Sequence, residues 1–144
     1  MWQEFFEKHS GAITTRTGAS EVDIQAAERA LGVKFPSDLQ IFLLVSDGLE
    51  GEYGLDLVWS LNRIVSDNLN FRGNNEFKEL YMPFNCLLFF GDAGNGDQFA
   101  FPIQADVIRR DDVFVWNHEN DSRTWAAPSL PKYLEWWLSG KLTV

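Results

Sequence analysis

Apolar residues in the first third of the chain recur every three or four positions, the spacing of one buried helix face. Ser20 is a favourable N-cap, and apolar residues follow it at helical spacing up to Gly32, a residue that commonly ends helices. Pro36 suits the start of the next helix, where its missing N–H costs nothing. With their caps, helices are predicted over residues 2–8, 20–32, 36–48, 61–71 and 129–140.

The apolar period shortens to two after residue 85, which is typical of strands. Phe99, Phe101 and Ile103 alternate onto one face. Strands are predicted over residues 55–59, 86–90, 98–103, 113–116 and 123–126, and the polar segment 72–79 is expected to be irregular. Short connections favour an antiparallel meander, so the order of elements predicts an α+β domain with N-terminal helices, a central sheet and a C-terminal helix.

Composition indicates one folded domain, residues 1–144, because 45% of the residues are hydrophobic and 15% are aromatic. No apolar run approaches the roughly 20 residues that cross a bilayer. The start, Met1-Trp2-Gln3-Glu4, lacks the positive region and apolar stretch of a secretion signal, so a cytoplasmic protein is expected. The single cysteine, Cys86, cannot form an internal disulfide and is expected to be an inert core residue.

The net charge of −9 disfavours direct binding to nucleic acid or to an anionic membrane and favours a basic partner. An acidic surface that only keeps the protein soluble is the simpler interpretation of composition alone. The distribution of charge argues for more, since no basic residue lies between Lys34 and Arg63 or between Lys78 and Arg109. If the fold brings the acids of these two stretches together, the surface there is strongly negative.

Four motifs in a fixed order carry a family resemblance. They are the run 31–43 with the following Asp47-Gly48, the glycine-and-aspartate turn in 90–97, the strand and His-Glu turn in 113–119, and the helix 130–138. Together they resemble the SUKH superfamily, which includes the fungal cell-wall regulators of the Smi/Knr type. The resemblance extends over residues 20–140 and is poorest over residues 49–81.

The resemblance implies a central, mainly antiparallel sheet of about six strands flanked by helices. For bacterial members it implies an immunity protein that binds and occludes a cognate secreted toxin, often a nuclease, whereas fungal members resemble regulatory scaffolds. It implies neither a catalytic mechanism nor a cofactor. The alternatives are a regulatory or scaffolding module without a toxin partner and, less favoured, a small-ligand-binding protein or a hydrolase. The identity of the toxin and the oligomeric state stay open.

Two turns contain residues with chemical potential. The glycines of 91–97 are followed by no Lys or Ser/Thr of a P-loop, and the spacing of its acids does not fit an EF-hand. The scattered His9, Cys86 and His118 cannot form a recognisable zinc site, so no metal is predicted. His118 stands beside carboxylates but has no serine or cysteine nucleophile in a recognisable setting. Both segments are predicted to be structural turns, and no enzyme activity is expected.

The predicted partner-binding residues are therefore acids, together with a tryptophan that could anchor an interface. Both Trp59 and Trp136 are candidates for exposure. The full set is Asp47, Glu50, Glu52, Asp56, Trp59, Asp92, Asp97, Asp111 and Asp112.

Overall fold

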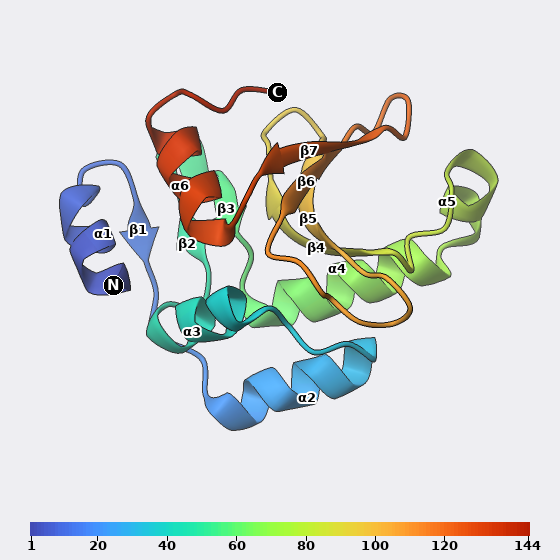
Figure 1. Cartoon of the computed structure of the whole chain (residues 1–144), viewed down its shortest axis with the longest axis horizontal. Coiled ribbons are helices and arrows are strands. Elements are labelled where there is room, and N and C mark those ends of the chain that lie inside the picture. The colour runs from blue at the N-terminus through green and yellow to red at the C-terminus, as the bar shows by residue number, and fades with distance from the viewer.

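The computed structural model describes residues 1–144 (Figure 1). The α-helices are α1 (Trp2–Lys8), α2 (Glu21–Leu31), α3 (Ser37–Val45), α4 (Leu61–Gly73), α5 (Asn75–Leu80) and α6 (Leu130–Leu138). The strands are β1 (Thr14–Thr15), β2 (Leu49–Glu50), β3 (Asp56–Val58), β4 (Leu87–Asp92), β5 (Gln98–Pro102), β6 (Val113–Trp116) and β7 (Arg123–Ala127), and a 3-10 turn, η1 (Glu52–Gly54), connects β2 to β3. The predicted α+β class is confirmed.

The expected helix boundaries are present because their capping residues act locally. The Ser20 hydroxyl accepts a hydrogen bond from the Asp23 N–H at 3.1 Å, and Gly32 ends α2 with a φ of 69°. The expectation of an irregular segment over 72–79 is wrong. Asn74 accepts a hydrogen bond from the Glu76 N–H at 2.9 Å and starts α5, so one short polar helix follows α4 directly.

The strands form two antiparallel sheets, β1-β2-β3 and β4-β5-β6-β7. The prediction of a single sheet of about six strands is therefore wrong. At the junction, Trp59 N donates to Phe90 O at 2.7 Å, and a Cβ on Gly91 would lie 2.3 Å from Leu57 O. The register of β4 also shifts between Phe89 and Gly91. The two sheets thus meet at a close main-chain approach without forming a continuous ladder. No helix is both long enough and apolar enough to cross a membrane.

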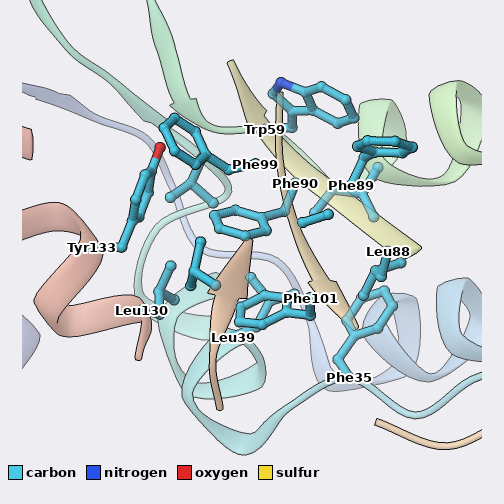
Figure 2. Packing of buried hydrophobic residues seen from close by; sticks show 14 of the residues in the cluster. Phe35, Leu39, Trp59, Leu88, Phe89, Phe90, Phe99, Phe101, Leu130 and Tyr133 are labelled. Atoms are coloured by element: carbon cyan, nitrogen blue, oxygen red, sulfur yellow. The ribbon is translucent and has the colours of Figure 1, made fainter. Parts of the chain in front are cut away.

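The core lies where α6 and the N-terminal helices pack on the strands (Figure 2). Phe90 and Phe101 stack with ring centroids 4.6 Å apart, and Tyr133 of α6 packs against Phe99 at 4.6 Å. The Tyr133 hydroxyl donates to Leu57 O at 2.8 Å, which ties α6 to β3. The expectation that Cys86 is a core residue is wrong, because β4 begins one residue later and Cys86 is exposed.

Candidate protein-binding surface

Acids from the two cation-free stretches do meet in the fold, at a shared arginine. Arg63 of α4 donates to both oxygens of Asp92, at 2.7 and 3.1 Å. The same guanidinium lies 3.2 Å from Asp56 and 3.0 Å from Asp67. Residues at the start of β3 and the end of β4 are therefore brought together.

The expectation that these acids lack cations is wrong for Asp56 and Asp92. Arg16 lies 3.0 Å from Asp56, so the cluster contains three carboxylates and two guanidiniums and keeps one net negative charge. Burial opposes the charge on Arg63, but its hydrogen bonds to Asp92 and Asp67 outweigh this effect, and the pKa of Arg63 is raised. We refer to Arg16, Asp56, Arg63, Asp67 and Asp92 as the Arg63 cluster.

Trp59 lies beneath this cluster and is fully buried. The Arg63 guanidinium covers its ring, 4.1 Å from the centroid. A partner therefore cannot reach Trp59 unless Arg63 moves. Trp136 is half-buried beneath the Lys141 ammonium, and the tryptophan with the largest exposed fraction, 48%, is Trp125.

The loop between β2 and β3 presents an aromatic residue that the sequence analysis did not single out. Tyr53 is fully exposed, with a φ of 60° that bulky residues rarely adopt. Glu52 beside it is exposed, Glu50 is half-buried, and neither carboxylate forms an ion pair. The flanking Gly51 and Gly54 could have indicated this exposed residue, since two nearby glycines are typical of a tight turn whose side chains point to solvent. This turn, residues 50–54, is called the Tyr53 loop below.

Two of the predicted acids are used inside the fold. An Asp47 oxygen accepts the Leu61 N–H at 2.7 Å, which satisfies a free N–H at the start of α4 beside the N-cap Ser60. Asp97 is buried, with 8% of its side chain exposed, and binds both the His118 main-chain N–H at 3.1 Å and the ring Nδ1 at 2.7 Å. This contact fixes the β4–β5 turn to the β6–β7 turn, which agrees with the predicted structural role of both.

The remaining predicted acids, Asp111 and Asp112, lie before β6, at the end opposite His118. Asp112 pairs with Arg110 at 3.1 Å and accepts the Trp125 indole N–H at 2.7 Å. Those hydrogen bonds hold the pKa of Asp112 below its usual value. Neither acid shares a hydrogen bond or an ion pair with the Tyr53 loop or the Arg63 cluster, so the contacts of the structure do not join all of the predicted residues into one set.

The titratable groups of this surface are arranged neither as a metal site nor as a complete catalytic triad. The described chain contains no group of three or more His, Cys, Asp or Glu side chains placed to hold a metal ion. The His118–Asp97 pair resembles half of a catalytic triad, but no hydroxyl or thiol is hydrogen-bonded to the His118 ring. What the surface offers is an exposed phenol beside carboxylates.

Comparison with known proteins supports the motif-based resemblance. A family model described as SMI1-KNR4 cell-wall (SUKH_6) matches residues 21–134, which include α2 through most of α6. No curated protein matches the chain. Because the match covers most of the domain and the fold is α+β as that resemblance implies, the chain belongs to the SMI1-KNR4 family of the SUKH superfamily.

Proposed function

We propose that this SUKH domain is an immunity protein that acts in the cytoplasm, where it binds and occludes a cognate toxin with a basic, nuclease-type domain. The observation that carries the proposal is the Tyr53 loop, where a fully exposed tyrosine stands beside Glu52 and Glu50. Aromatic residues supply much of the energy of protein interfaces, and neighbouring charge selects the partner.

The electrostatics of the whole chain favour the same partner. A net charge of −9 attracts a basic domain over a distance and raises the rate of encounter. Part of this charge lies in the Arg63 cluster, whose three carboxylates exceed its two guanidiniums by one. Occlusion of a cationic cleft requires no chemistry, so the absence of a reactive constellation does not weaken the proposal.

We select the contact residues from the predicted set by their exposure and position. Glu50, Glu52, Asp56 and Asp92 are the acids that we place in the interface, with Tyr53 in the anchoring role that the sequence analysis gave to Trp59. Contacts through Asp111 and Asp112 would require a separate part of the partner, because they lie at the other end of β6.

Binding of a toxin domain encoded by the neighbouring gene tests the proposal. Tyr53→Ala should weaken binding by about 30-fold, the effect of losing one interface hot spot. Glu52→Lys should slow association at low salt and lose that effect as salt rises. Val22→Ala on α2, which truncates another exposed side chain, and Glu79→Lys on α5 are the matched controls, and both should bind like the wild type.

Unchanged, salt-independent binding by Tyr53→Ala and Glu52→Lys would remove this surface from the interaction. If the chain instead binds a cellular protein and no toxin, the regulatory or scaffolding alternative holds. Melting curves of all four variants should coincide, since each replaced side chain is exposed and takes part in no ion pair.

A further inference from the structure

A small cavity lies at the junction of α4, α5 and the segment that enters β4. Figure 1 shows α5 at the end of the molecule opposite α1. The cavity is half-enclosed and has a volume of about 210 Å³. It is smaller than the roughly 300–1,000 Å³ pockets that hold drug-sized ligands, so its volume suits one ring with a short substituent.

Four of the nine residues that line the cavity are aromatic. Phe71 and Phe77 stack with centroids 5.2 Å apart, Tyr81 lies 5.9 Å from Phe77, and Phe84 packs edge-on to Phe71 at 5.3 Å. Met82 is 59% exposed beside them. Several flat faces and an adaptable thioether are suited to a planar apolar group.

The cavity wall is held in place by residues 118–123, a segment distant in the sequence. The Asp121 carboxylate accepts the Met82 N–H at 2.8 Å, and Arg123 donates to Met82 O at 2.9 Å. The Tyr81 hydroxyl donates to His118 O at 2.8 Å. Burial opposes the charge of Asp121, yet the hydrogen bonds that it accepts from the Met82 N–H, the Trp116 indole and Arg123 prevail, and its pKa is lowered. A cavity with fixed walls loses little entropy on binding, which favours affinity for a small ligand.

The polar residues of the cavity are cationic or neutral. Arg72 and Lys78 line it together with Asn85, and no carboxylate does, although the chain has 21 acids and 12 bases. Arg72 donates to Leu31 O at 3.0 Å and to Leu87 O at 3.3 Å, while its Nε is buried without a partner. Burial lowers the pKa of Arg72, because no anion compensates its charge.

We propose that this cavity binds a small aromatic carboxylate. The ring would lie against Phe77 and Tyr81, and the carboxylate would face Lys78, with the uncompensated charge of Arg72 adding to the attraction. An anion in this position supplies the negative charge that the lining lacks. This ligand site lies outside the Tyr53 loop and is independent of the proposed toxin binding.

Phenylacetate is the test ligand, titrated into the isotope-labelled full chain and followed by amide NMR. Saturable shifts are expected for residues 71–85. The neutral phenylacetamide and the cationic phenethylamine keep the ring and lose the anion, so each should bind at least about 10-fold more weakly, as expected for loss of a charge-assisted contact.

Variants locate the site. Lys78→Met should weaken phenylacetate binding by about 10-fold, whereas Lys34→Met, which removes another exposed lysine without an ion pair, should not. Phe77→Ala removes a wall and should abolish saturation while the melting curve reports whether the fold is kept. Tyr53→Ala should leave this binding unchanged, which separates it from the toxin experiment. Shifts without saturation, equal affinity for the neutral amide, or binding that survives Lys78→Met would each overturn the proposal.

Discussion

Replacing Arg63 with alanine would remove the cation that pairs with both Asp67 and Asp92. The two-pronged contact with Asp92 contributes roughly 1.5–3 kcal/mol, because hydrogen bonds to charged groups at partly buried sites are the stronger kind. The more exposed pairs with Asp56 and Asp67 add about 0.5 kcal/mol each, and stacking on Trp59 adds about 0.5–1 kcal/mol. We therefore expect Arg63→Ala to lower the free energy of unfolding by about 3–5 kcal/mol, with relaxation of the carboxylates toward solvent bringing the loss to the lower end of this range.

Urea unfolding followed by tryptophan fluorescence measures this loss, and thermal unfolding should show a fall in Tm of about 10 °C for a domain of this size. Lys132→Ala is the control, since Lys132 pairs with Glu135 at 3.2 Å with about half of each side chain exposed. That variant should stay within about 0.5 kcal/mol of the wild type. Arg63→Lys keeps the charge without the planar fork and should fall between the two.

A loss in Arg63→Ala no larger than that in Lys132→Ala would refute the assignment of Arg63 as the centre of the cluster. A double-mutant cycle with Asp92→Asn provides an independent check, because the two side chains should show a coupling energy above about 0.5 kcal/mol. Arg63→Ala also removes a positive charge and so leaves the cluster more negative. If the proposed partner is basic, folded Arg63→Ala should associate with it faster at low salt.

Two further predictions concern the junction of the sheets. Gly91→Ala places a methyl group 2.3 Å from Leu57 O and should cost about 3 kcal/mol in urea unfolding, whereas Gly11→Ala, with no atom within 4 Å, should be nearly neutral. Tyr133→Phe removes the hydrogen bond to Leu57 O and should cost about 1–2 kcal/mol at neutral pH. Burial, together with the nearby Asp92, raises the pKa of Tyr133 well above 10.0. The contribution of the Tyr133 hydroxyl to the free energy of unfolding is therefore complete below pH 10 and declines at higher pH. The difference in unfolding free energy between wild type and Tyr133→Phe should narrow above pH 10, and a constant difference would contradict this assignment.

Capping residues and apolar spacing predicted most helices, and the two wrong predictions, at α5 and Cys86, can be traced to the sequence around them. Ser20, Gly32 and Ser129 act within one turn of their own helix, so their roles are independent of the rest of the fold. The helix α5 was missed because six polar-rich residues show no clear period, and its only signal was Asn74, a favourable N-cap. Cys86 was placed inside a strand because an apolar run does not show where its first inward-facing residue lies.

The acids show what charge patterning can predict. The sequence left open whether acids of the two stretches converge, and Asp56 and Asp92 do meet at Arg63. Their neutralisation could not be predicted, because Arg63 only borders a cation-free stretch and Arg16 lies 40 positions before the Asp56 that it pairs with. The spacing of charged residues in the sequence gives the sign of the charge of a segment, but it does not show which residue pairs with any one charge.

The amino-acid sequence alone determined the α+β class, the positions of every helix except α5, the order of the last four strands and the family motifs, since each depends on periodicity, capping and turn residues that act over a few positions. Only the tertiary structure decided that the sheet divides between β3 and β4, that Trp59 lies beneath Arg63, and that Tyr53 is exposed. These properties depend on which distant segments share space. Contacts such as Tyr133 to Leu57, 76 positions apart, are set by packing of the whole core and leave no local pattern.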